Sequence, residues 1–189
     1  MWQALRDLDR EWFLKLNGTG TEAWDGFWLF LSDKWLAIPF YLLLLLVAWR
    51  DLGWRRLLLL LLFVALLITC TDQLSNFFKV GVGRLRPCHD PALQPFVRLV
   101  KDSCGGRFGY FSAHAANALG LAAFFTTLWG RRRLGWGVLL LLWASAVGFS
   151  RVYLGVHFPF DVLTGFAAGA LFGWLFARLF TFARQKWMP

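Results

Sequence analysis

Long apolar stretches without Asp, Glu, Lys or Arg recur along the chain, and they constrain its fold more than any other feature. They cover residues 35–49, 57–71, 108–130, 134–150 and 162–177. A helix needs about 20 residues to cross a hydrocarbon core of about 30 Å, and the shorter stretches reach that length with their polar flanks. We therefore expect an all-α integral membrane protein, a helical bundle with about five transmembrane helices.

The composition excludes a water-soluble domain. Hydrophobic residues make up 58% of the 189 residues and charged residues 16%, with 12 Trp and 20 Phe. A soluble domain of this size cannot bury so large an apolar fraction. Neither a linker nor a change of composition divides the chain, so we expect a single membrane domain over residues 1–189. Its transmembrane bundle is predicted over 35–180, with a long outer loop over 79–111.

Residues 1–34 differ from the rest of the chain. They mix Trp, Phe and Leu with charged residues and contain no continuous apolar run that forms a signal peptide. Such a mixture is typical of helices that lie in the membrane interface. The turn-forming run Asn17-Gly18-Thr19-Gly20 predicts a break between two such helices.

The net charge of +9 is explained by membrane topology rather than by nucleic-acid binding, because the basic residues lie between apolar stretches. Three clusters at alternate connections mark the cytoplasmic side: Arg50, Arg55 and Arg56; Arg131, Arg132 and Arg133; Arg178, Arg184 and Lys186. We therefore expect a multi-pass protein of the cell (inner) membrane, with the lipid bilayer and no nucleic acid as partner. The loop over 79–111 is also basic although it lies on the periplasmic (extracytoplasmic) side, and an anionic substrate explains its charge.

The first polar cluster lies at the outer end of the second apolar stretch, where Lys79 is followed after six residues by Arg86 and Pro87. Either basic residue alone is most simply a snorkelling or solvated side chain at a helix end. Gly81 and Gly83 loosen that helix end, and Pro87 stiffens the chain after Arg86. Together the ammonium group of Lys79 and the planar guanidinium of Arg86 can bind one phosphate.

The second cluster is Ser112, Ala113 and His114, directly before an apolar helix. Ser112 is well placed as the N-cap, so that the amides of Ala113 and His114 point outward at the positive end of the helix dipole. Such a helix start binds phosphate readily. His114 on its own would be only an amphipathic residue at the membrane boundary.

The third cluster runs from Arg151 to His157 and Asp161, with Pro159 between the last two. Pro159 suits the first turn of a helix, which places His157 just before that helix and Asp161 within its first turn. A carboxylate there can accept one imidazole N–H and leave the other nitrogen as a nucleophile. Taken alone, Asp161 would be no more than a favourable partner of the helix dipole.

The sequence resembles the type 2 phosphatidic acid phosphatase superfamily, whose signature is Lys-x6-Arg-Pro, Pro-Ser-Gly-His and Ser-Arg-x5-His-x3-Asp. The first and third motifs match fully, and the second keeps Ser112 and His114. The departures are Phe111 in place of Pro and Ala113 in place of Gly. The β-carbon of Ala113 narrows the phosphate pocket if the backbone there requires a positive φ.

The resemblance implies a mechanism that agrees with the roles inferred above from the residues themselves. His157 attacks phosphorus and Asp161 orients it, while His114 protonates the leaving oxygen and later serves as base for water. Phosphate is bound by Lys79, Arg86, Arg151 and the helix start at Ser112 and Ala113. A phosphohistidine is the intermediate, and we expect neither a metal nor a cofactor, because the cationic side chains supply the charge.

Several features have two interpretations that the sequence leaves open. Asp72 and Asn76, below Lys79, either line the cavity for the lipid head group or bond neighbouring helices. Cys88 and Cys104, both in the outer loop, either form a disulfide or remain free thiols. The glycines at every fourth position of the last stretch reflect helix packing inside the bundle or a dimer interface, so the oligomeric state is open: Gly165, Gly169 and Gly173.

Two other functions fit these residues less well than phosphatase activity does. A catalytically silent lipid-phosphate binder or transporter has no need of both a nucleophile and an acid, yet His157 and His114 are both present. Vanadate-dependent haloperoxidases share the constellation but are large soluble proteins. The expected substrate is a membrane lipid phosphate of one of four kinds: undecaprenyl diphosphate, phosphatidylglycerol phosphate, phosphatidic acid or the 1-phosphate of lipid A.

Overall fold

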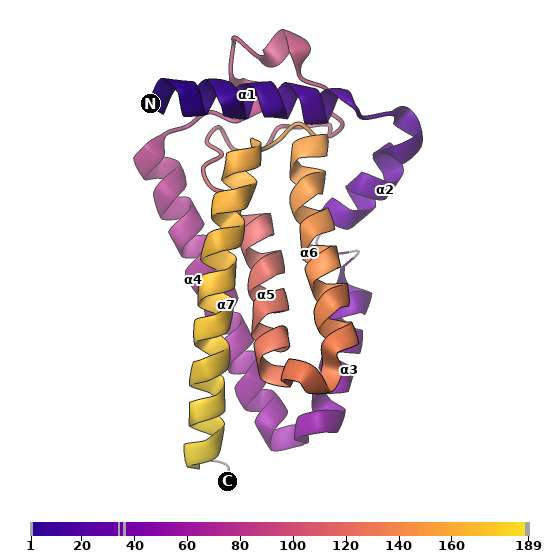
Figure 1. Cartoon of the computed structure of the whole chain (residues 1–189), viewed down its shortest axis with the longest axis vertical. Coiled ribbons are helices and arrows are strands. Elements are labelled where there is room, and N and C mark those ends of the chain that lie inside the picture. The colour runs from indigo at the N-terminus through magenta and orange to yellow at the C-terminus, as the bar shows by residue number, and fades with distance from the viewer. Residues whose placement is uncertain (1, 34, 36, 188–189) are drawn as a thin grey trace.

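The computed structural model describes residues 2–33, 35 and 37–187, and these form a helical bundle with one helix lying across its end (Figure 1). The α-helices are α1 (Trp2–Gly18), α2 (Glu22–Ser32), α3 (Ile38–Leu52), α4 (Trp54–Val82), α5 (Ala113–Trp129), α6 (Leu134–Tyr153) and α7 (Pro159–Trp187). Short 3₁₀ turns are η1 (Pro87–His89), η2 (Gln94–Phe96) and η3 (Gly130–Arg133). No strand occurs among the described residues, so the all-α prediction is confirmed.

In the part of the chain that the structure describes, three helical stretches are long and apolar enough to cross a membrane: Trp54–Val82, Ala113–Tyr153 and Pro159–Trp187. The second of them contains α5 and α6, which η3 joins as an antiparallel pair (Figure 1). Helix α3 has 15 residues, fewer than the about 20 that a span needs. The predicted count of about five spans is therefore not confirmed.

The predicted break in the N-terminal segment is confirmed, since α1 ends at Gly18 and α2 begins at Glu22. Helix α1 lies across the end of the bundle at which α6 ends and α7 begins (Figure 1). The buried side chain of Asn17 fixes it there. Its amide nitrogen donates to the carbonyls of Val152 (3.2 Å) and Tyr153 (2.8 Å), and its oxygen accepts the N–H of Arg98 at 2.8 Å.

Helix α4 continues to Val82, three residues beyond Lys79, so the outer connection begins at Gly83 and not at 79. Gly83 has φ 61°, a left-handed conformation that glycine adopts without strain, and its N–H bonds the carbonyl of Lys79 at 3.1 Å. The predicted boundary was wrong because the glycine that terminates the helix is the second of the pair. Lys79 is consequently held on the last turn of a helix.

The glycines at every fourth position of α7 lie against α5, which favours packing inside the bundle as their explanation. A β-carbon at Gly169 would stand 2.2 Å from the carbonyl oxygen of Ala116, and one at Gly173 would stand 2.2 Å from that of Gly120. Both distances are far below ordinary contact, so the two backbones touch at these positions. This close approach brings the start of α5 beside the start of α7.

The three basic clusters lie at or near the connection between α3 and α4, the η3 turn and the C-terminal end of α7. These segments are at the end of the bundle opposite to α1 (Figure 1). Such a distribution agrees with the positive-inside rule. Which end faces the cytoplasm remains a prediction.

Candidate active site

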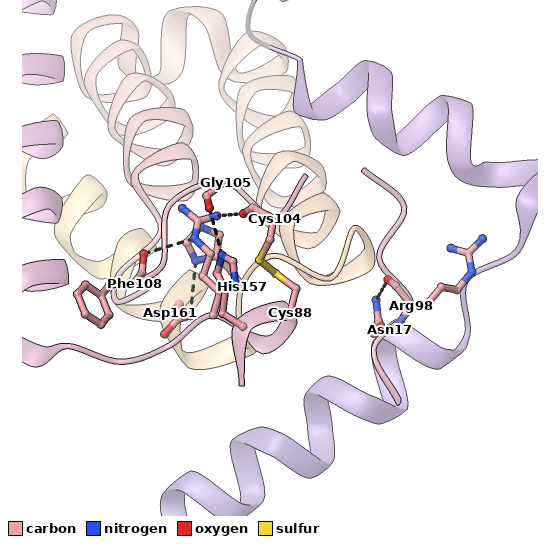
Figure 2. The surroundings of a disulfide bond; sticks show 10 residues. Asn17, Cys88, Arg98, Cys104, Gly105, Phe108, His157 and Asp161 are labelled. Carbon is pink, nitrogen blue, oxygen red and sulfur yellow. Dashed lines mark hydrogen bonds and ion pairs between the residues drawn. A yellow bond between two sulfur atoms is a disulfide. The ribbon is translucent and has the colours of Figure 1, made fainter. Parts of the chain in front are cut away.

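The third motif forms a buried imidazole–carboxylate pair under α1. His157 lies in the connection between α6 and α7, and Asp161 lies in the first turn of α7, which begins at Pro159 as predicted. Their side chains are 2% and 0% exposed, and Nδ1 of His157 is 3.5 Å from Oδ2 of Asp161 (Figure 2). The distance exceeds that of a good hydrogen bond. The carboxylate of Asp161 therefore faces the ring just beyond hydrogen-bond distance.

The protonation state of His157 suits a nucleophile. Burial lowers its pKa well below the usual 6.5, and the charges of Arg151, Arg86 and Lys79 lower the pKa further. The imidazole is therefore neutral at pH 7, with a lone pair available. The three cations that the sequence predicts to bind phosphate are therefore close enough to His157 to affect its pKa.

Arg86 is held by the outer loop. Its backbone N–H donates to the carbonyl of Arg107 at 3.1 Å, which pairs the two sides of the loop. The guanidinium donates through Nη1 to the carbonyl of Cys104 (3.2 Å) and through Nε to that of Phe108 (3.4 Å) (Figure 2). A guanidinium has five N–H donors, and these bonds use two of them, which leaves donors for an anion.

The disulfide between Cys88 and Cys104 closes this loop, with the two Cα atoms 6.0 Å apart. Figure 2 shows it beside the pair of His157 and Asp161. Cys104 also supplies a carbonyl to Arg86, so the crosslink fixes one wall of the site. Cys70 is a free cysteine on α4.

Arg151, on the last turn of α6, is 4% exposed. One Nη atom donates to the hydroxyl of Ser32 at the end of α2, whereas Nε is buried and has no hydrogen-bond partner within residues 2–33, 35 and 37–187. A buried guanidinium with an unsatisfied N–H is costly unless a ligand accepts that bond. Arg151 is thus equipped to bind an anion.

The second motif starts α5 as predicted. Ser112 is the N-cap, and its hydroxyl accepts the N–H of Ala115 at 3.4 Å. Its own N–H donates to the carbonyl of Asp161 at 3.0 Å, which ties the starts of α5 and α7 together. Ala113 is the first residue of α5 and has no positive φ, so its β-carbon causes no backbone strain.

A cavity of about 360 Å³ begins at Ala113 and His114 and continues between α3, α4, α5 and α6. Its wall is mostly apolar. Asp72 lines it and also accepts a hydrogen bond from Asn117 at 2.9 Å, which joins α4 to α5. That a lipid head group enters this cavity stays a prediction. Asn76 is exposed on α4 and does not line this cavity.

Two residues that the sequence did not assign to the site contact it: Arg84, at a variable position of the first motif, and Asp9, outside the motifs. Arg84 donates through Nη1 to Oδ1 of Asp161 (3.0 Å) and through Nη2 to Oδ2 of Asp9 (2.7 Å). In the sequence Arg84 was one basic residue among several in the loop. Asp9 belongs to α1, and no pattern in the sequence connects it with a motif 152 residues later in the chain, at Asp161.

The site therefore combines a neutral imidazole, a carboxylate, three cations and a helix N-terminus beside a second imidazole. Cations and amides arranged in this way stabilise the charge of a phosphoryl group in transfer. Among residues 2–33, 35 and 37–187, no group of three or more His, Cys, Asp or Glu side chains could hold a metal ion.

Comparison with known proteins identifies the family of the chain. The model of the PAP2 superfamily matches residues 56–185. Over 178 residues, 93% of this chain and 78% of the relative, the sequence is 36% identical to the lipid A 4′-phosphatase of Bacteroides thetaiotaomicron. It is 31% identical to the lipid A 4′-phosphatase of Porphyromonas gingivalis over 187 residues, 98% of this chain and 78% of that protein.

Two crystal structures have a similar fold. LpxE of Aquifex aeolicus superposes with a TM-score of 0.66 at 26% identity, over 89% of this chain and 93% of that one. The transmembrane PAP2-type phosphatidylglycerolphosphate phosphatase of Bacillus subtilis superposes with a TM-score of 0.72 over 97% of this chain and 89% of that one, and its 22% identity supports the fold alone.

The chain is therefore a membrane protein of the phosphatase class that hydrolyses phosphoric esters. It belongs to the PAP2 superfamily.

Proposed function

We propose that this protein is an extracytoplasmic lipid phosphatase that removes the 4′-phosphate of a lipid A type glycolipid through a phosphohistidine. The observation that carries the chemistry is the neutral, buried His157 beside Asp161 and among three cations. The substrate class rests on similarity to two lipid A 4′-phosphatases that extends over 93% and 98% of the chain. On this proposal residues 1–189 act as one domain.

In the first step the phosphate is bound by Lys79, Arg86, Arg151 and the N-terminus of α5 at Ser112. The cations neutralise the non-bridging oxygens, which lowers the barrier to attack by a neutral nucleophile. The unsatisfied Nε of the buried Arg151 supports its part in this binding. The positive charge that stabilises the phosphoryl group is thus supplied by side chains of the protein.

In the second step Nε2 of His157 forms a bond to phosphorus while the bond to the lipid oxygen breaks. His114, on the first turn of α5, gives a proton to that oxygen, and the dephosphorylated lipid leaves. Water then attacks the phosphohistidine, with His114 taking a proton from it, and inorganic phosphate is released. Asp161 stabilises the positive charge that His157 acquires.

The lipidic nature of the substrate is supported by the apolar cavity of about 360 Å³ that starts at His114. An acyl chain of a membrane lipid fits such a cavity by its chemistry, because its wall is formed by apolar side chains of α3 to α6. The reacting phosphate would then lie at the end of the bundle near α1. We place this end on the periplasmic side because the three arginine clusters lie at the other end.

The test is phosphate release by the detergent-purified protein from four lipids: lipid A bisphosphate, undecaprenyl diphosphate, phosphatidylglycerol phosphate and phosphatidic acid. Mass spectrometry of the product with fragmentation of the disaccharide distinguishes loss of the 4′-phosphate from loss of the 1-phosphate. His157→Ala serves as the blank. His89→Ala, which changes an exposed histidine of the same loop, is the matched control.

We expect lipid A to lose only its 4′-phosphate, with wild-type rates in His89→Ala and none in His157→Ala. Release from another of the four lipids but not from lipid A would overturn the substrate assignment. Loss of the 1-phosphate alone would overturn the position. Normal turnover in His157→Ala would overturn the mechanism.

A further inference from the structure

The carboxylate of Asp161 is held by two contacts besides His157. Oδ2 accepts the backbone N–H of Phe158 at 3.0 Å, and Oδ1 accepts Nη1 of Arg84 at 3.0 Å. The side chain is fully buried, so water does not solvate the carboxylate. Its orientation toward His157 therefore depends on these protein donors.

Arg84 is arranged to act on Asp161 rather than on phosphate. Its two Nη atoms donate to Asp161 and to Asp9, and its guanidinium lies 3.9 Å from the centre of the Phe158 ring. The backbone is fixed as well, since its carbonyl accepts the N–H of Gly109 at 2.9 Å. Because both Nη groups bind carboxylates and an aromatic ring covers one face of the guanidinium, Arg84 is not available to bind a substrate.

Asp9 completes the arrangement from α1. It is fully buried, its Oδ2 accepts Nη2 of Arg84 at 2.7 Å, and its Oδ1 accepts the N–H of Phe160 at 2.9 Å. Burial raises its pKa, whereas the N–H of Phe160 and the charge of Arg84 lower the pKa. Asp9 thus binds both Arg84 and the first turn of α7, the turn that carries Asp161.

We propose that Arg84 and Asp9 are positioning residues, which hold the carboxylate of Asp161 against His157 and make α1 a part of the catalytic apparatus. Asp9, Arg84 and Asp161 together carry a net charge of −1 from two carboxylates and one guanidinium. This charge balances the positive charge that His157 acquires on phosphorylation. The inference rests on the proposed role of His157 as nucleophile.

The first experiment measures kcat and KM for Arg84→Lys and Asp9→Asn. Lysine keeps the charge but, as a point donor, cannot join two carboxylates with the geometry of the guanidinium. In metalloproteins, removing a group that orients a histidine ligand typically lowers metal affinity or activity about 10- to 100-fold. We expect a fall in kcat on that order for Arg84→Lys and a smaller one for Asp9→Asn, with KM unchanged in both.

Arg10→Gln is the matched control. Arg10 is the next residue of α1 and pairs with Asp90 at 2.8 Å, a contact that ties α1 to the loop without touching Asp161. We expect its kcat to stay near the wild-type value. An equal loss in Arg10→Gln and Asp9→Asn would mean that α1 only needs to be docked, and would overturn the proposal.

A double-mutant cycle with Asp161→Asn separates positioning from general stability. If Arg84 acts through Asp161, adding Arg84→Lys to Asp161→Asn should change kcat by less than about twofold. Multiplicative losses would overturn the proposal. If Arg84→Lys does not fold, the same cycle with Asp9→Asn decides in the same way.

The failure of this inference is distinct from the failure of the proposed function. Turnover that persists in His157→Ala refutes the proposed mechanism whatever Arg84 does. An inactive His157→Ala together with normal kcat in Arg84→Lys and Asp9→Asn refutes only the positioning role.

Discussion

Replacing Gly169 by alanine should damage both stability and catalysis, because it separates α5 from α7. The new β-carbon would stand 2.2 Å from the carbonyl oxygen of Ala116 and 3.0 Å from its Cα. To reach even a 3.0 Å contact with that oxygen the helices must move apart by about 0.8 Å, from 3.0 − 2.2. The obstructing atom is helix backbone, so no side-chain rotation relieves the clash.

The displacement has two measurable consequences. Overpacking of this kind costs about 1–3 kcal/mol, which lowers the Tm of a chain of this size by about 2–12 °C. The hydrogen bond from Ser112 to the carbonyl of Asp161 joins the same two helices, so the site is distorted as well. A shift of about 1 Å can cost about 10²-fold in rate, and we expect kcat to fall by about 10- to 100-fold.

The assay compares Tm in detergent and kcat for Gly169→Ala and Gly135→Ala. A β-carbon at Gly135, in the first turn of α6, meets nothing within 4 Å, so this variant should keep both values. If Gly169→Ala kept wild-type Tm and kcat while Gly135→Ala did too, the direct backbone contact between α5 and α7 would be refuted.

Three further predictions concern the acid, the topology and the loop. His114→Ala should slow the first-turnover burst on the order of 10²–10⁴-fold with a lipid phosphate but far less with a nitrophenyl phosphate, whose leaving group needs no proton; equal losses would remove the acid role. In a background without the native cysteines, an impermeant thiol reagent applied to intact cells should label Gln94→Cys and not Arg132→Cys; the reverse pattern inverts the topology. Cys88 and Cys104 should resist alkylation until reduced, and reduction should cost about 3 kcal/mol for a ring of this size; recovery of free thiols from unreduced membranes contradicts this.

The parts of the fold that were predictable are those that depend on neighbouring residues. Pro159 marks the start of α7 because its fixed φ and missing N–H suit a first helical turn, and Ser112 marks the start of α5 because its hydroxyl accepts a helical N–H. The apolar stretches predict helices because the length and composition of one continuous segment are enough to indicate a membrane span. The break after Asn17 follows from the glycines beside it.

The parts that were not predictable depend on contacts between distant segments. Asp9 and Arg84 are 75 residues apart, and nothing local distinguishes their ion pair from a pair of solvated charges. The end of α4 at Val82 was missed because Gly81 and Gly83 each suit a helix end, and only the positive φ of Gly83 selects one. Asp72 and Asn76 were equivalent by sequence, whereas the cavity lies beside the first alone.

The central claim is that the phosphoryl group passes through His157, and trapping that intermediate tests it most directly. The protein would be mixed with lipid A labelled in its phosphates, quenched in alkali within the first turnover, digested, and analysed by mass spectrometry, since phosphohistidine is expected to survive alkali better than acid. We predict a phosphorylated peptide modified at His157, formed before phosphate appears in solution and missing from His157→Ala. Release of phosphate in a burst without any modified His157, or phosphate on another residue, would contradict the account.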